Sequence, residues 1–234
     1  MASISIAEWA RLLPTAAEIT DGEKPVVFSC GNHDMRVIYA ENIGDHTPTD
    51  KGNSYYTFRL ESIRGMVLDC GEDKPDDHAE YGHTICCEDF RERQTLFIKD
   101  VIARAEREYK ADGVANKIIV CHAPFSEKNK PPFDIEEKTY TEWCRLLREY
   151  IKPHIMLCGH VHQAYVTNVG DEIDAFGQPC PVIVASAAGS SNATVKGRLG
   201  IKGTFIGAGF TAIKDGYDVI FVGDNGVKYH RAFL

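Results

Sequence analysis

Three short polar motifs, each placed directly after an apolar stretch, constrain this chain more than any other feature. They are Gly31-Asn32-His33-Asp34, Cys121-His122-Ala123-Pro124 and Gly159-His160-Val161-His162. The apolar stretches before them, residues 26–28, 118–120 and 155–157, have the length and composition of short buried strands. Because loops at strand ends can converge, we expect one asparagine and three histidines from these motifs to meet at a single site.

The asparagine and histidine side chains of these motifs suit a metal ion. Zinc, manganese and iron accept imidazole nitrogen together with amide or carboxylate oxygen. His160 and His162 are two residues apart, so in extended backbone their side chains point the same way. We therefore predict a divalent-metal site (Mn, Fe or Zn) with the ligands Asn32, His122, His160 and His162.

His33 and Asp34 suit a different task. An imidazole beside a metal site can donate a proton to a departing alkoxide, and a neighbouring carboxylate can orient that imidazole and raise its pKa. The alternative is a plain turn that ends a strand, because Gly, Asn and Asp are common turn residues. The two later histidine motifs favour the catalytic interpretation.

The rest of the chain alternates helical and strand patterns, which predicts an α/β layered domain with some antiparallel strands. We expect helices over residues 6–13 (ending near Pro14), 89–110 and 136–150. Strands are expected over 25–30, 117–120 and 154–157, and a hairpin over 55–60 and 65–69. The short strands expected near the C-terminus are 181–186, 203–213 and 217–222, followed by a hairpin turn at 224–226.

Length and composition exclude several classes of protein. At 234 residues the chain forms one sizeable core, so we expect a single domain over residues 1–234. The net charge of −8 argues against a nucleic-acid partner. No apolar stretch approaches the roughly 20 residues that span a bilayer, so we expect no membrane partner.

Eight cysteines without framework-like spacing favour a reducing compartment, and we expect a cytoplasmic protein. Cys30, Cys121 and Cys158 lie within two residues of a motif and could be thiolate ligands. Burial as small apolar side chains at strand ends is the better interpretation.

In their order and composition, the three motifs resemble those of the calcineurin-like metallophosphoesterase family, which shows G-N-H-D/E, an isolated histidine after a strand, and G-H-x-H. The segments 55–58, 68–69 and 94–98 also fit. The resemblance implies a layered two-sheet sandwich flanked by helices, with two metal ions at the strand ends. It implies that Asn32, His122 and His160 bind one metal, that His162 binds the other, and that His33, oriented by Asp34, faces the phosphate.

This sequence departs from the family pattern before residue 31. Family members begin with D-x-H and a G-D pair, which supply further ligands and a bridging aspartate, and neither precedes Asn32. Asp76-Asp77-His78 is the only D-x-H, and its charged surroundings, residues 71–83, are typical of a solvated loop. We therefore expect an N-terminally incomplete domain that lacks its first strands. An intact family member binds two metals, and we expect this chain to bind one or none.

Two functions remain open. The first is a metal-dependent phosphoesterase that hydrolyses a phosphate mono- or diester by metal-activated hydroxide, and that is incomplete as this chain alone. The second is a non-catalytic, degenerate relative that binds at most one metal and acts as an interaction module. The partners implied are a phosphate-ester substrate and, because uncovered sheet edges associate, a second copy or a complementing N-terminal segment.

Overall fold

The computed structural model describes residues 6–36, 40–134, 137–185, 198–199, 206–223, 226 and 228–233. Its helices are α1 (Ile6–Thr20), α2 (Cys87–Ala103), α3 (Ala105–Glu108), α4 (Glu137–Leu146) and the short turns η1 (Asn32–Arg36), η2 (Ala40–Asp45), η3 (Ala79–Tyr81) and η4 (Leu147–Ile151). The strands are β1 (Tyr56–Leu60), β2 (Ile63–Leu68), β3 (Asn116–Cys121), β4 (Ile155–Cys158), β5 (Ala164–Thr167), β6 (Val182–Val184), β7 (Arg198–Leu199), β8 (Ile206–Ile213), β9 (Gly216–Gly223) and β10 (Lys228–Phe233).

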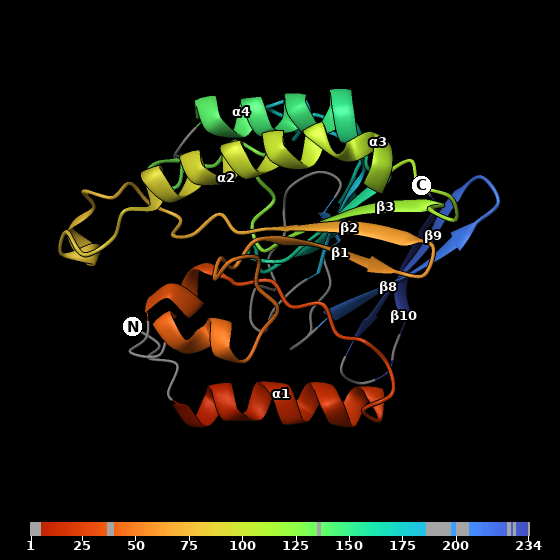
Figure 1. Cartoon of the computed structure of the whole chain (residues 1–234), viewed down its shortest axis with the longest axis horizontal. Helices are drawn as coiled ribbons and strands as arrows, with labels where there is room; N and C mark the ends of the chain where they lie inside the picture. Colours follow the sequence, from red (N-terminus) through yellow and green to blue (C-terminus); the bar gives the residue numbers. More distant parts are fainter. Residues whose placement is uncertain are drawn as a thin grey trace.

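A mixed sheet forms the centre of the described structure (Figure 1). Its strand order is β1-β2-β3-β4-β6-β5-β7, and β8, β9 and β10 form a separate antiparallel sheet. Strands β2, β3, β4 and β6 run parallel to one another, whereas β1 pairs antiparallel with β2, and β5 with β6. The carboxyl ends of β2, β3 and β4 therefore lie at the same edge of the sheet.

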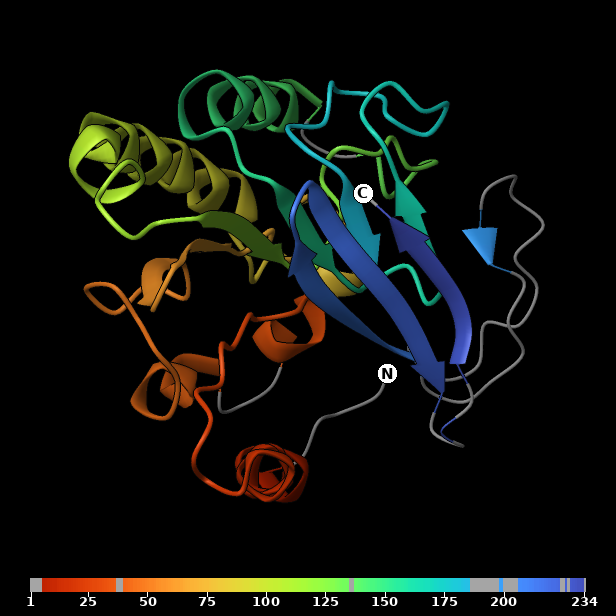
Figure 2. The ribbon, with the colours of Figure 1, turned by 90° about the vertical axis from the view of Figure 1, so that its right-hand side faces the viewer.

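Alternating residues of the central strands pack into two different cores. Ile119 and Met156 belong to the core beneath α2 and α4, whereas Ile118 and Ile155 pack with buried residues of β8 and β9. Figure 2 shows the small sheet on the side of the mixed sheet away from these helices. This period of two is the pattern of strands buried on both faces. The predicted α/β architecture is confirmed, whereas a full two-sheet sandwich is not established among the described residues.

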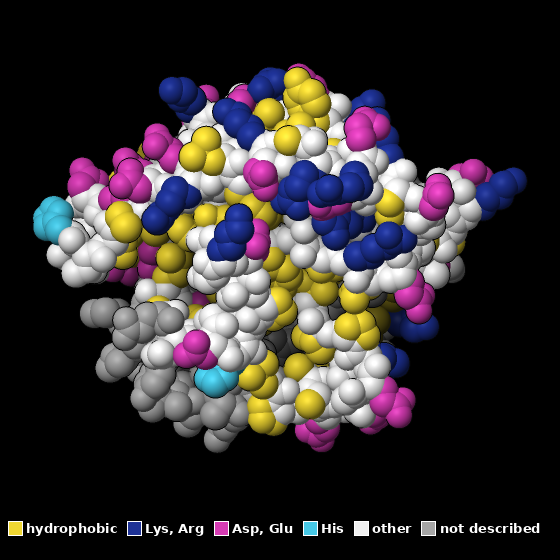
Figure 3. Space-filling model, viewed as in Figure 1, with side chains coloured by type: hydrophobic (Ala, Val, Ile, Leu, Met, Phe, Trp, Pro, Cys, Tyr) yellow, Lys and Arg dark blue, Asp and Glu magenta, His cyan; other side chains and the backbone are white. Residues whose placement is uncertain are grey.

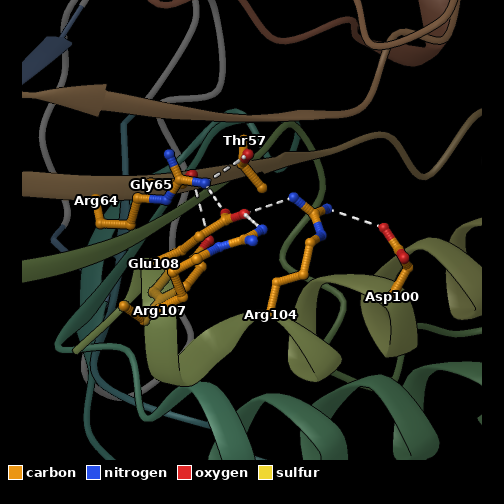
Figure 4. Close-up of polar contacts among 8 residues, drawn as sticks. Thr57, Arg64, Gly65, Asp100, Arg104, Arg107 and Glu108 are labelled. Atoms are coloured by element: carbon orange, nitrogen blue, oxygen red, sulfur yellow. Dashed lines mark hydrogen bonds and ion pairs between the residues drawn. The ribbon is translucent and has the colours of Figure 1, made fainter. Parts of the chain in front are cut away.

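A cluster of ion pairs joins the helical layer to the mixed sheet (Figure 4). Glu108 of α3 contacts Arg64 of β2 and accepts a hydrogen bond of 2.6 Å from Arg104. Arg64 also donates to Thr57 of β1 (3.0 Å), and Arg104 pairs with Asp100 of α2 (2.9 Å). Because Glu108 and Arg64 are both largely shielded from water, this cluster orients the end of the helix on the hairpin.

The hairpin, the long helix and the later strands were predicted close to their observed positions. The β1–β2 turn is shorter than expected, since Leu60 already pairs with Ile63. The predicted 89–110 helix is divided at Arg104 into α2 and α3. The 136–150 helix ends in a single π-helical turn, η4. Residues 224 and 225 of the predicted hairpin turn lie outside the described residues, and β9 and β10 pair antiparallel on either side.

Two predictions near the N-terminus were wrong. Residues 25–30 form no strand, because no described strand pairs with this segment; its anchors include a hydrogen bond from the Tyr56 hydroxyl to the Phe28 carbonyl (2.7 Å). Helix α1 does not end near Pro14 but contains it and continues to Thr20. Proline lacks an N–H group, so the helix forgoes one internal hydrogen bond at this position.

The loop after β2 is held by two fully buried polar side chains of α2. Gln94 accepts a hydrogen bond from the Asp69 N–H (2.9 Å) and donates to the Asp69 carbonyl. Arg91 donates to the carbonyls of Cys70 (2.7 Å) and Glu72 (3.1 Å). The loop is therefore attached to the helix through its backbone, which leaves its side chains available for other contacts.

We predict that Gln94→Met lowers the free energy of unfolding by about 2 kcal/mol or more, because it leaves the buried N–H and carbonyl of Asp69 without partners. Urea unfolding followed by circular dichroism measures the change. Glu92→Met, at an exposed position of the same helix, is the control and is expected to change stability by less than about 0.5 kcal/mol. Equal effects for the two variants would contradict the role of Gln94.

Helix α1 lies away from the sheet in both views (Figures 1 and 2), and Leu13, Ile19 and Val26 expose 39%, 76% and 48% of their surface. Figure 3 shows hydrophobic side chains gathered around a hollow between the helical layer and the level of α1. Apolar surface exposed in this way favours association.

We therefore predict that the chain self-associates. Sedimentation at high concentration should give masses above the 26.0 kDa of one chain. Ile19→Glu should shift the distribution towards the monomer, while Val169→Glu, at an exposed position in the loop after β5, should not. A wild-type protein that stays monomeric would show the prediction to be wrong.

Candidate functional site

The three sequence motifs meet at the edge of the sheet where β3 and β4 end. His122 directly follows β3, His160 comes two residues after β4, and Asn32 begins η1. A cavity of about 540 Å³ is lined in part by Asn32, His33, Asp73, His122, His160 and His162. The predicted ligands Asn32, His122, His160 and His162 therefore share one cavity with the predicted catalytic residue His33.

Two local contacts bring the loops together. The N–H of Gly159 donates a hydrogen bond of 2.8 Å to the His122 carbonyl, which joins the loops after β3 and β4. The imidazole rings of His122 and His160 lie 5.1 Å apart, edge to face. A Cβ atom on Gly31 would stand only 3.1 Å from the His122 ring. The glycine of the first motif thus lets that loop pack directly on the histidine of the second.

Asn32 has the environment expected of a ligand. Its side chain is buried, with 4% of the residue exposed, and its Oδ1 atom has no hydrogen-bond partner among the described residues. Burying an oxygen in this state costs about 1–3 kcal/mol. A cation would provide a partner for that oxygen, so the Asn32 amide is a suitable type of metal ligand.

His122 is held in its neutral form. Burial, together with the nearby His160, His33 and His162, lowers its pKa to about 4. At neutral pH its ring therefore keeps an unprotonated nitrogen that can bind a metal.

The argument that placed His160 and His162 on one side of an extended strand was wrong. Strand β4 ends at Cys158, and both histidines have positive φ angles of 65° and 56°. Left-handed backbone is costly for a residue other than glycine, and such strain is often found at functional sites. Both residues nevertheless line the cavity, His160 half-buried and His162 exposed.

Asp34 makes a different contact from the one predicted. Its carboxylate accepts a hydrogen bond of 2.7 Å from the N–H of Gly31, and no hydrogen bond joins it to His33 among the described residues. Burial is the main cause that raises its pKa. Asp34 therefore stabilises the turn that carries Asn32, while His33 is exposed at the cavity.

The metal-binding groups are incomplete. In the part of the chain that the structure describes, no three His, Cys, Asp or Glu side chains are grouped so that they alone could hold a metal ion. What converges is a pair of histidines with an amide oxygen. These donors fit part of the coordination of one cation, and the assignment of individual ligands stays a prediction.

Asp73 lies at this site although the sequence did not point to it. Its Oδ2 atom is 3.8 Å from Nε2 of His160, and it lines the same cavity. The prediction that residues 71–83 form a solvated loop was wrong at its start, where Glu72 and Lys74 are buried. The signal available in the sequence was position. Asp73 lies in the loop after β2, just as His122 and His160 lie in the loops after β3 and β4.

The first aspartate of the only D-x-H of the sequence bonds the start of a helix. The carboxylate of Asp76 accepts hydrogen bonds from the N–H groups of Cys87 (3.0 Å) and Glu88 (3.2 Å). It therefore caps the start of α2, where a negative charge is favourable.

No family model matches the sequence, and no curated protein matches it. Among solved structures, the chain is similar to a dimetal phosphatase from Danio rerio, with a TM-score of 0.51, 14% identity, and coverage of 97% of this chain and 78% of that one. It also matches the purple acid phosphatase PPD1 from yellow lupin (TM-score 0.46, 14% identity, 79% of this chain and 33% of the lupin chain) and PhoD (TM-score 0.38, 10% identity, 73% and 36%). The chain thus spans about a third of the lupin and PhoD chains.

The fold is that of the metallophosphoesterases, which confirms the resemblance predicted from the three motifs.

No described helix is long and apolar enough to cross a membrane.

The depressed pKa of His122 predicts how stability depends on pH in the metal-free protein. A histidine of this kind stabilises the fold fully above its unfolded pKa of about 6.5, and that contribution is lost as the pH falls towards about 4. Between these limits we expect wild type to lose roughly 3 kcal/mol that His122→Gln does not lose. Urea unfolding with a chelator present measures the difference.

The exposed His46 is the control for this prediction, and His46→Gln should keep the wild-type dependence on pH. Parallel curves for wild type and His122→Gln would contradict the assignment of a neutral, buried imidazole.

Proposed function

We propose that this chain is a metal-dependent phosphoesterase domain that acts on phosphate mono- or diesters. The observation that supports the proposal best is the convergence of Asn32, His122 and His160 on one cavity, with His33 exposed beside them. The metallophosphoesterase fold supports the same class of reaction, as do the positions of His122 and His160 shortly after β3 and β4.

Each group has a role in this proposal. Asn32 and His122 offer a buried amide oxygen and a neutral imidazole nitrogen, and together with His160 and His162 they would hold divalent Mn, Fe or Zn. Such a cation would lower the pKa of a water molecule and offset the negative charge that develops on the phosphate. His33 would donate a proton to the leaving alkoxide, and Lys130, on the same cavity, would attract a phosphate oxygen.

The second candidate function is a non-catalytic metal-binding module, and the missing acidic motifs are the reason to consider it. D-x-H and G-D carboxylates do not precede Asn32, and three grouped acidic, thiol or imidazole ligands are not found in the described part of the chain. We propose that a second copy of this chain completes a dinuclear centre in the active form, so turnover is expected under conditions in which the chain self-associates. A chain that binds one metal without turnover would instead be a non-catalytic binding module.

The test is hydrolysis of p-nitrophenyl phosphate and bis-p-nitrophenyl phosphate in added Mn²⁺, together with metal stoichiometry. We expect turnover whose kcat falls about 100-fold in His33→Ala, because general acid catalysis is lost. His46→Ala, at an exposed histidine that does not line the cavity, is the control and should keep wild-type turnover.

Two outcomes would contradict the proposal. Metal binding without turnover of either ester would favour the binding module. No metal binding at all would exclude both candidates as stated.

A further inference from the structure

We propose that Asp73 is a carboxylate ligand of the cation bound by Asn32, His122 and His160, an inference that rests on the proposed function. Among the described residues that line the cavity of about 540 Å³, Asp73 is the only acidic one. It also lines a neighbouring pocket together with the same asparagine and the same two histidines. Two adjoining pockets thus bring this carboxylate to the predicted ligands.

The separation of Asp73 and His160 fits two ligands of one ion. Their Oδ2 and Nε2 atoms are 3.8 Å apart, which is too far for a hydrogen bond. Two ligands about 2.1 Å from one metal at tetrahedral or right angles are about 3.0–3.4 Å from each other. As the described side chains stand, Asp73, His122 and His160 are not grouped closely enough to hold an ion. A shift of about half an ångström would bring the Asp73 and His160 atoms into one coordination sphere, so the proposal requires the carboxylate to move towards the histidines when the metal binds.

The other oxygen of Asp73 is already oriented by its neighbours. Oδ1 accepts hydrogen bonds from Nζ of Lys74 (3.2 Å) and from the hydroxyl of Tyr81 (3.1 Å). Lys74 is itself paired with Glu80 (3.1 Å) and lies over the ring of Phe133, 5.1 Å from its centre. Partners of this kind fix the orientation of a ligating carboxylate, and here they hold Oδ2 of Asp73 on the side of His160.

Charge and desolvation support the same assignment. The imidazole of His122 and the amide of Asn32 are neutral, so they do not offset the charge of a divalent cation. Asp73 contributes a negative charge from a loop whose backbone is attached to α2 by Arg91 and Gln94. The buried Oδ1 of Asn32, which has no partner among the described residues, marks where an additional positive group is needed.

Titration of the full chain with Co²⁺, followed by its visible absorption, and with Mn²⁺, followed by electron paramagnetic resonance, tests the proposal. Asp73→Asn should weaken binding by at least about tenfold and change the Co²⁺ spectrum, because a charged oxygen ligand is lost. Asp77→Asn is the matched control, an exposed aspartate in the same loop, and should bind as wild type does. Chelator-treated samples compared by thermal unfolding show whether each variant is folded.

A second variant keeps the test decisive if Asp73→Asn does not fold. Lys74→Met leaves the carboxylate in place but removes a partner that orients it, and should give a smaller loss of affinity. Equal affinities and spectra for wild type, Asp73→Asn and Lys74→Met would overturn the role of Asp73 while the phosphoesterase proposal stands. Wild type that binds neither metal would overturn both.

Discussion

The attachment of α2 to the end of β2 is the constraint on which the candidate site depends. Arg91 and Gln94 are fully buried polar side chains, and burial of such groups is tolerable only when they are hydrogen-bonded. Gln94 and the Nη1 atom of Arg91 satisfy this requirement by bonding the backbone of residues 69–72. The same contacts therefore join the helical layer to the sheet and determine where the acidic residues after β2 lie.

Parallel pairing of β2, β3 and β4 then brings three loops to one edge of the sheet. His122 and His160 become neighbours because their strands are adjacent and because Gly159 bonds the loop of His122. The G-N-H-D motif reaches the site differently, since no strand precedes it among the described residues. Gly31 packs on the His122 ring, and the carboxylate of Asp34 holds the turn that carries Asn32.

The site combines two neutral donors, Asn32 and His122, with Asp73 as the acidic residue on the cavity of about 540 Å³. Burial and neighbouring imidazoles keep His122 unprotonated, and Asn32 has an unpaired buried oxygen. The family that this chain resembles in motif order has further carboxylate ligands at the metal site, which come from its D-x-H and G-D motifs. The missing motifs would precede Asn32 in the sequence, whereas Asp73 follows the β1–β2 hairpin. A search for ligands restricted to the first strands therefore overlooks it.

The sequence by itself determined the hairpin, the long helix, the positions of the two strands before His122 and His160, and the family resemblance, because apolar periodicity and spacing of motifs are local properties. It also identified Asn32, His122, His160 and His162 as residues that would meet. The tertiary structure decided what local pattern does not contain: residues 25–30 remain outside the sheet, Asp34 bonds Gly31 rather than His33, and His160 and His162 adopt left-handed backbone. It alone showed Asp73 beside His160, because that contact joins residues 87 positions apart and depends on how α2 packs on the sheet.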